Sequence, residues 1–144
     1  MGKAEEIEIR FARAEDLAWC RVEDALVAEE VIRRKMELNE IIVAEIGGRR
    51  AGYLRLEYLW SKMPFIGLIV VQEENRGQGI GQALLKFLEL FLRRNGHKAL
   101  FSSSQASEPS PQAWHRAVGF EECGFLAGVN EGGVGEVFFR KSLT

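Results

Sequence analysis

The stretch Arg76-Gly77-Gln78-Gly79-Ile80-Gly81 constrains the fold of this chain more than any other part of the sequence. It follows an apolar run at residues 65–71, which predicts a strand, and it opens a helical pattern that continues to about residue 94. Glycines at such a junction let backbone N–H groups approach an anion closely, and the helix N-terminus adds partial positive charge. Residues 76–81, called the glycine cradle below, therefore predict a binding site for a phosphate or pyrophosphate group.

A dinucleotide-binding Rossmann site fits these glycines poorly. They follow the fourth expected strand rather than the first, and no strand–helix–strand unit with a later acidic residue surrounds them.

The apolar pattern predicts a mixed α+β domain around one central sheet. Alternation, β-branched residues and turn signals predict strands at residues 7–11, 41–46, 50–59, 65–71, 98–103, 120–127 and 135–140. Helices are expected at residues 17–37, broken once, at 80–94 and at 112–118. The run at residues 65–71 does not alternate, so we expect it to be buried on both faces.

Length and composition narrow the class of protein. A chain of 144 residues predicts a single domain over residues 1–144, and a net charge of −2 argues against a nucleic-acid partner. No apolar stretch is long enough to span a bilayer, and the charged first ten residues lack a signal-peptide core, so we expect a cytoplasmic protein. Cys20 and Cys123 do not form a metal-ligand pair by spacing and are expected to be free, semi-buried thiols.

Two motifs give the chain a resemblance to the GNAT acetyltransferase superfamily. Arg76, Gly79 and Gly81 match that family's pattern of Arg or Gln, two residues, Gly, one residue, then Gly or Ala. Val71 stands where the family usually ends its fourth strand. Residues 114–120, Trp-His-Arg-Ala-Val-Gly-Phe, look like the late aromatic and Gly-Phe signature.

The resemblance implies a central mixed, twisted sheet of about seven strands with helices on both faces. It also implies acetyl-CoA as cosubstrate, with the pyrophosphate in the glycine cradle and no metal ion. The cofactor-binding residues implied are Ile69, Val70, Val71, Arg76, Gly77, Gln78, Gly79, Ile80 and Gly81. The first three of these would act through backbone groups that pair with the pantetheine arm.

Two departures from the family concern catalysis. His115 stands where most members have a tyrosine, and Phe65 stands where many have a glutamate base. His115 is either the group that protonates or hydrogen-bonds the departing thiolate, or a helix-surface histidine without a role. Glu57 is the best-placed carboxylate for a base, with a solvated strand carboxylate and a water relay as alternatives.

The histidine and the serines of residues 102–104 resemble the aminoglycoside 6'-N-acetyltransferase branch, but Gln105 follows where that branch has an acidic residue. The sequence therefore predicts an N-acetyltransferase that moves an acetyl group to a primary amine by direct attack in a ternary complex. An aminoglycoside-modifying enzyme and a non-catalytic acyl-CoA-binding module are the alternatives. The expected partner is a small-molecule or peptide amine, with no nucleic acid and no membrane, and the sequence leaves both a monomer and a homodimer open.

Overall fold

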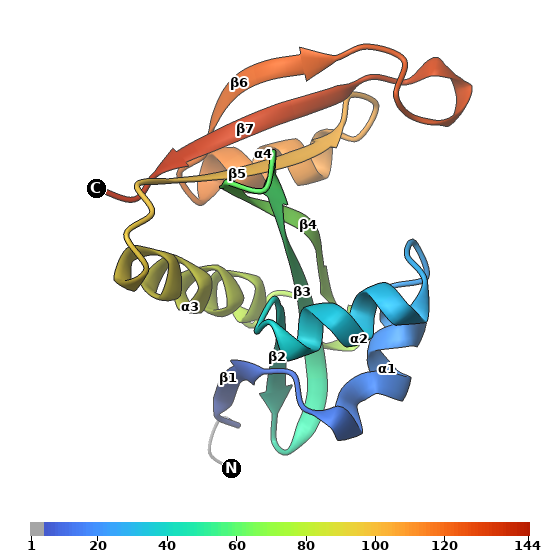
Figure 1. Cartoon of the computed structure of the whole chain (residues 1–144), viewed down its shortest axis with the longest axis vertical. Helices are drawn as coiled ribbons and strands as arrows, with labels where there is room; N and C mark the ends of the chain where they lie inside the picture. The colour runs from blue at the N-terminus through green and yellow to red at the C-terminus, as the bar shows by residue number, and fades with distance from the viewer. Residues whose placement is uncertain (1–4) are drawn as a thin grey trace. The chain divides into compact units, whose positions relative to one another are not determined.

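The structure, a computed structural model, describes residues 5–144 and contains a mixed sheet of seven strands with four α-helices in that part of the chain (Figure 1). The strands are β1 (Ile7–Phe11), β2 (Ile41–Ile46), β3 (Arg49–Leu59), β4 (Met63–Val71), β5 (Ala99–Gln105), β6 (Glu121–Leu126) and β7 (Glu136–Ser142). The helices are α1 (Leu17–Glu23), α2 (Glu29–Glu37), α3 (Ile80–Arg94) and α4 (Pro109–Ala117). Short 3-10 turns lie at Ala14–Asp16, Glu73–Asn75 and Glu131–Gly133. The predicted α+β class with one central sheet is confirmed.

The strand order in the sheet is β1-β2-β3-β4-β5-β7-β6. β4 and β5 run parallel, with Phe65 opposite Phe101, whereas β1–β2, β2–β3, β5–β7 and β6–β7 are antiparallel pairs. The helix between β4 and β5 provides the long crossover that a parallel pair needs.

The chain forms two compact units. The first runs to Leu56 and resumes over Leu68–Leu90, and the second comprises Glu57–Gly67 and Phe91–Thr144. The prediction of a single domain over residues 1–144 stays a prediction, and each unit is described by itself below.

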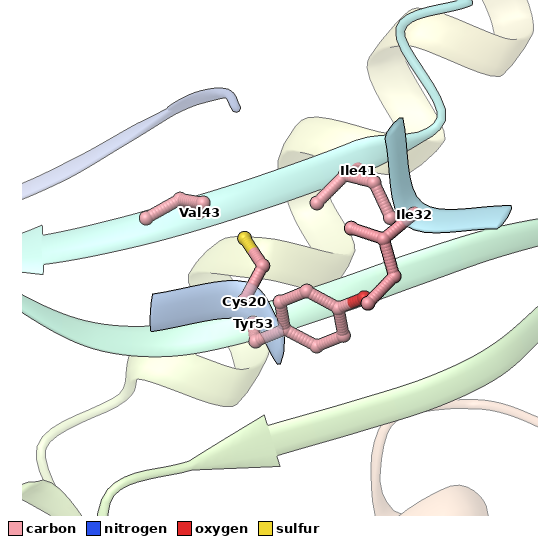
Figure 2. Close-up of a cluster of buried hydrophobic side chains, with 5 residues drawn as sticks. All are labelled: Cys20, Ile32, Ile41, Val43 and Tyr53. Carbon is pink, nitrogen blue, oxygen red and sulfur yellow. The ribbon is translucent and has the colours of Figure 1, made fainter. Parts of the chain in front are cut away.

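The first unit has an apolar core between its first two helices and strands β2 and β3 (Figure 2). Figure 2 shows Cys20 from α1, Ile32 from α2, Ile41 and Val43 from β2, and the ring of Tyr53 from β3. All five are at most 1% exposed, and burying each aliphatic side chain stabilises the fold by about 1.5–3 kcal/mol. Burial also raises the pKa of the Cys20 thiol to about 12, so this cysteine is a packing residue.

A buried carboxylate ties together the start of the first unit. Asp16 accepts hydrogen bonds from Arg10 Nη1 at 2.6 Å, from Arg50 Nε at 2.8 Å and from the Arg13 amide at 2.7 Å. Burial alone raises the pKa of Asp16, but these donors outweigh it and hold the pKa well below its usual range. The charged network connects β1 to β3 where the first 3-10 turn leads into α1.

The second unit is built around the antiparallel strands β5, β7 and β6, and Figure 1 shows α4 alongside β5 and β7. Alternate residues of β5 and β7 face α4, including Ser102, Ser104, Val137 and Phe139, all of them buried. The ring of Phe138 stacks on Phe65, with ring centroids 5.7 Å apart.

Several expectations need correction. Most of β4 is only half-buried, so the prediction that residues 65–71 are buried on both faces was wrong for most of the strand. The two cysteines are not semi-buried, because Cys20 is fully buried and Cys123 is exposed. α4 begins at Pro109 rather than at residue 112, since proline fits the first helical turn, where its missing N–H has no intrahelical partner.

Candidate cofactor site

The glycine cradle lies in the first unit, between the end of β4 and the start of α3. A 3-10 turn at Glu73–Asn75 follows the strand, and the chain then passes through Gly77 and Gly79 before the helix begins at Ile80. Both glycines have positive φ values, +80° and +83°. Only glycine adopts this left-handed conformation without strain, so the backbone conformation explains why residues 77 and 79 are glycines.

The backbone of the cradle is open on the side where side chains would stand. A Cβ atom added at Gly77 or at Gly79 would meet no other heavy atom within 4 Å. The first helical hydrogen bond of this junction runs from the Ala83 N–H to the Gly79 carbonyl, at 3.0 Å. The amides of Ile80 and Gly81 come before that bond, in the first turn, where N–H groups have no intrahelical acceptor. An anion at this point would meet amide donors and the positive end of the α3 dipole.

Arg76 connects the cradle to the strand that precedes it. Its side chain is exposed, and its Nε donates a hydrogen bond of 3.3 Å to the Val71 carbonyl. Upstream, the Asn75 amide donates to the Gln72 carbonyl at 2.9 Å, and the Gln72 amide donates to the Ala51 carbonyl at 2.8 Å. Backbone bonds therefore tie the segment before the cradle to β3, and the Arg76 side chain ties the cradle to the end of β4.

Gly52 on β3 packs closely against the helix turn that follows the cradle, and sequence reasoning missed it. An added Cβ at this position would lie 2.8 Å from Ile80 Cγ2 and 3.0 Å from Leu84 Cδ1. The missing side chain therefore allows the first turn of α3 to pack directly on β3. Gly52 stands within an apolar strand run, where a glycine indicates a close approach of neighbouring groups, and this was the signal available in the sequence.

A second polar group of the first unit lies at the end of α1 and was also missed. Asp24 is buried, and its Oδ2 accepts hydrogen bonds from the Tyr53 hydroxyl at 2.7 Å and from Arg55 Nε at 2.6 Å. Burial, followed by the bond to Asp24, raises the pKa of Tyr53 well above its usual range. Asp24 Oδ1 has no hydrogen-bond partner among the described residues. The hydrogen bonds from Tyr53 and Arg55 therefore hold Asp24, the residue that follows α1, against β3.

His115 lies in the second unit, on α4, and is only 3% exposed. Its Nε2 lies 2.7 Å from Ser102 Oγ and its Nδ1 lies 2.7 Å from the Pro111 carbonyl oxygen. A carbonyl can only accept, so Nδ1 carries the proton and Nε2 accepts from the Ser102 hydroxyl. The ring also stacks on Phe139, with centroids 4.6 Å apart and planes 2° from parallel.

The surroundings of His115 favour its neutral form. Burial lowers the pKa of His115, the Arg116 charge lowers it further, and the bond to the Pro111 carbonyl and the charge of Glu136 offset this in part. With one nitrogen donating to Pro111 and the other accepting from Ser102, no N–H of the ring is directed at a further acceptor. The expectation of a surface location in the alternative for His115 is wrong, because the ring is buried between α4 and its strands, whereas a catalytic role for His115 stays a prediction.

Glu57, the carboxylate predicted as a base, also lies in the second unit and is half-buried on β3. The structure thus brings the nine predicted cofactor-binding residues together in the first unit, while Glu57 and His115 belong to the second.

No helix in residues 5–144 is both long and apolar enough to cross a membrane. The same residues contain no group of three or more His, Cys, Asp or Glu side chains that could hold a metal ion.

Comparison with known proteins assigns the family. The family model described as "Acetyltransferase (GNAT) domain" matches residues 37–122, which include β2 to α4 and therefore the glycine cradle and His115. The match covers more than half of the chain, and this chain belongs to the GNAT acetyltransferase family.

Individual relatives agree with this assignment. The aminoglycoside N(6')-acetyltransferase type 1 of Stenotrophomonas maltophilia is 40% identical over 62 residues, which are 43% of this chain and only 40% of that protein. The ribosomal-protein-alanine N-acetyltransferase structure from Brucella melitensis has a TM-score of 0.78 and 27% identity, covering 94% of this chain and 99% of that one. A putative acetyltransferase from Salmonella typhimurium, solved with its cofactor acetyl-CoA, has a TM-score of 0.78 and 19% identity, covering 96% and 94%.

Proposed function

We propose that this protein is an acetyl-CoA-dependent N-acetyltransferase that acetylates a primary amine by direct attack in a ternary complex. One observation carries the proposal: the glycine cradle has two left-handed glycines with open space beside them at the start of a 15-residue helix. Such a cradle fits a pyrophosphate because it offers backbone amides and a helix N-terminus without side chains in the way.

The cradle residues Gly77–Gly81 would hold the pyrophosphate through their amides, and Arg76 would add its positive charge. Backbone groups of Ile69, Val70 and Val71 would pair with the amide-bearing arm of the cofactor as a neighbouring strand would. When bound, acetyl-CoA supplies an acetyl group activated as a thioester. The amine would attack the thioester carbonyl, which an amide near Val71 would polarise.

Acetyl transfer from the thioester to an amine also requires two proton transfers. The attacking amine must lose a proton and the departing thiolate must gain one, and Glu57 and His115 remain the residues predicted for these roles. His115 would donate a proton only if Nδ1 gave up its bond to the Pro111 carbonyl, or if Nε2 gave up its bond with Ser102 and first gained a proton. A role for His115 in catalysis therefore requires a rearrangement that a purely packing role does not require.

The acceptor class has a second candidate. An aminoglycoside acceptor is favoured by the 40% identity to the Stenotrophomonas maltophilia enzyme over 62 residues. An acidic side chain also stands next to the serine segment, where the sequence itself offers none: Glu136 of β7 accepts a hydrogen bond of 2.6 Å from Ser103. A carboxylate at this position would favour a polycationic substrate over a neutral one.

Two measurements test the proposal together. Release of coenzyme A is followed with a panel of amines that contains aminoglycosides, polyamines and peptides with free N-termini. Thermal melts are recorded with acetyl-CoA at about 100 times its dissociation constant, which adds about 2.7 kcal/mol to the free energy of unfolding. For a domain of this size the melting temperature should rise by roughly 4 °C or more, and NADH should leave it unchanged.

The outcomes separate the alternatives. A raised melting temperature with coenzyme A release supports the enzyme, and the most active amine identifies the acceptor class. A raised melting temperature with no release from any amine would favour the non-catalytic acyl-CoA-binding module. An unmoved melting temperature would refute the cofactor assignment.

A further inference from the structure

The two faces of the β5–β7 strand pair differ in how far they are covered. Ser102 and Phe139 lie on one face and are buried, in contact with His115 of α4. The residues on the other face are only half-buried. This face, called the open face below, consists of Phe65, Phe101, Ser103, Glu136 and Phe138. Its side chains are the ones in the second unit that a ligand can reach beside a closed core.

Glu136 is the carboxylate of the open face, and two neutral groups hold it. Its Oε2 accepts a hydrogen bond of 2.6 Å from Ser103 Oγ, and its Oε1 accepts one of 2.8 Å from Asn130 Nδ2. Neither donor carries a charge, and Glu136 forms no ion pair with any residue in the described part of the chain. A carboxylate offers about four acceptor positions, so Glu136 retains positions for further donors and a negative charge that no ion pair compensates.

Asn130 orients this carboxylate from the turn that links β6 to β7. Two backbone bonds close the turn on itself, from the Asn130 amide to the Val134 carbonyl at 3.0 Å and from the Gly133 amide to the Asn130 carbonyl at 3.1 Å. The Asn130 backbone therefore has a defined position, from which its side chain reaches Glu136. A carboxylate oriented by two separate elements has its geometry set before a ligand arrives, which lowers the cost of binding.

The negative charge of Glu136 selects a cation, and it also determines which amine of an acceptor lies there. An amine must be neutral to attack a thioester, whereas a neighbouring carboxylate favours the protonated form of an amine. Resting on the proposed function, we propose that Glu136 binds an ammonium group of the acceptor that does not react. The acceptor then carries at least two amino groups. Ser103 and Asn130 act as positioning residues for the carboxylate.

The aromatic residues of the open face favour an acceptor in which a ring carries this ammonium group. Phe138 stands two positions from Glu136 on β7, about 6.8 Å along the strand. Its ring stacks on Phe65, with centroids 5.7 Å apart. A sugar ring with an amino substituent spans such a distance, and the C–H groups on one side of the sugar ring can pack on the aromatic pair. The acceptor class that fits is an amino sugar with two or more amino groups.

Calorimetric titration of neamine, a small aminoglycoside with several amino groups, into the protein saturated with coenzyme A tests the inference. Glu136→Gln removes the charge, keeps the size of the side chain and should raise the dissociation constant at least tenfold. Glu131→Gln is the matched control, because it makes the same change of charge on the same turn at an exposed residue. It should leave the dissociation constant unchanged. Asn130→Ala keeps the charge but removes one of its orienting bonds, and should raise the constant by a smaller factor.

Two further ligands test the acceptor class. Glucosamine, which has a single amino group, and spermidine, which has no ring, should both bind more weakly than neamine. Tighter binding of either one would overturn the inference. Equal weakening of neamine binding by Glu131→Gln and Glu136→Gln would also overturn it, because general charge attraction would then explain the affinity.

Titration of coenzyme A itself separates this inference from the proposed function. All three variants should bind coenzyme A as the wild type does, which also shows that they are folded. A wild-type protein that binds coenzyme A but not neamine would overturn the inference and leave the proposed acetyltransferase standing. A wild-type protein that binds no coenzyme A would refute the proposed function, and this inference with it.

Discussion

The glycine cradle and the surroundings of His115 contain the two motifs that first indicated the family. They differ in whether their hydrogen-bonding groups are free for a ligand or already paired within the protein. In the cradle the backbone carries the function, two glycines have no neighbour where a side chain would stand, and the first-turn amides precede the helical hydrogen bonds. Around His115 the side chain is the centre, and it is buried, stacked on Phe139 and hydrogen-bonded at both nitrogens.

This difference distinguishes a motif that serves ligand binding from a motif that serves folding. An open backbone site gains stability only when a ligand supplies the missing contacts, so its glycines make sense as part of a binding site. A side chain with all its hydrogen bonds made contributes to folding without a ligand. The comparison predicts that changes in the cradle affect binding more than stability, and that changes at His115 affect stability strongly.

The largest effect on stability is expected from His115→Phe. The phenyl ring keeps the contact with Phe139 but leaves the buried Ser102 hydroxyl without its acceptor and removes the side-chain donor to the Pro111 carbonyl. An unsatisfied buried hydroxyl costs about 1–3 kcal/mol and a lost hydrogen bond about 0.5–1.5 kcal/mol, so the free energy of unfolding should fall by roughly 2–4 kcal/mol. Urea denaturation measures this, and Ser102→Ala, which removes only one of the two bonds, should cost less.

The same variant tests the predicted proton donor. If His115 protonates the thiolate, turnover of the folded variant should fall by about 10²–10⁴-fold while acetyl-CoA still binds. A full loss of turnover with no loss of stability would contradict the view that the histidine is held in a satisfied packing position.

The next largest effect on stability is expected at Gly52, which lies in close contact with the first turn of α3. Gly52→Ala adds a methyl group against Ile80 and Leu84, and overpacking of this kind costs about 1–3 kcal/mol. Because the first turn of α3 must shift, the affinity for coenzyme A should fall as well. Gly48→Ala on the preceding hairpin, where an added Cβ meets nothing within 4 Å but the φ is +77°, should also lose stability, through backbone strain, and should leave the affinity unchanged.

The smallest effect is the pH dependence that His115 gives to stability. Burial lowers its pKa in the folded state, so the unfolded chain binds the proton more readily. The contribution of His115 is therefore fully present above the unfolded pKa of about 6.5 and is lost as the pH falls through the lower, folded-state value. Melting temperatures between neutral and mildly acidic pH should show this loss in the wild type, and His115→Phe should lack it.

Much of the fold was predictable because its signals are local. The face of α3 formed by Ile80, Leu84, Leu85, Leu88 and Leu92 is buried as the helical period predicts. The glycine pair at residues 47 and 48 forms the turn between β2 and β3, with positive φ at both positions. The cradle was equally predictable, since its glycines, the preceding strand and the following helix are adjacent in the sequence.

The parts that sequence could not predict depend on distant residues. The burial of His115 requires Phe139 and Ser102, which come from two strands on either side of α4 in the sequence. The role of Gly52 depends on Ile80, twenty-eight positions later, and that of Asp24 depends on Tyr53 and Arg55. A side chain's environment is a property of the tertiary structure, whereas the conformation of a glycine turn is encoded locally.

Calorimetric titration of coenzyme A into two glycine variants tests the central claim most directly. Gly79→Asp places a carboxylate in the cradle, and Gly96→Asp places one beyond the other end of α3, at the same φ of +83° and with the same open surroundings. The two substitutions therefore carry the same backbone strain, while the α3 dipole favours a carboxylate at residue 79 over one at residue 96. Gly79→Asp should lower the affinity at least tenfold, equivalent to about 1.4 kcal/mol, while Gly96→Asp should bind as the wild type does. Unchanged affinity in a folded Gly79→Asp protein would contradict the assignment of the cradle.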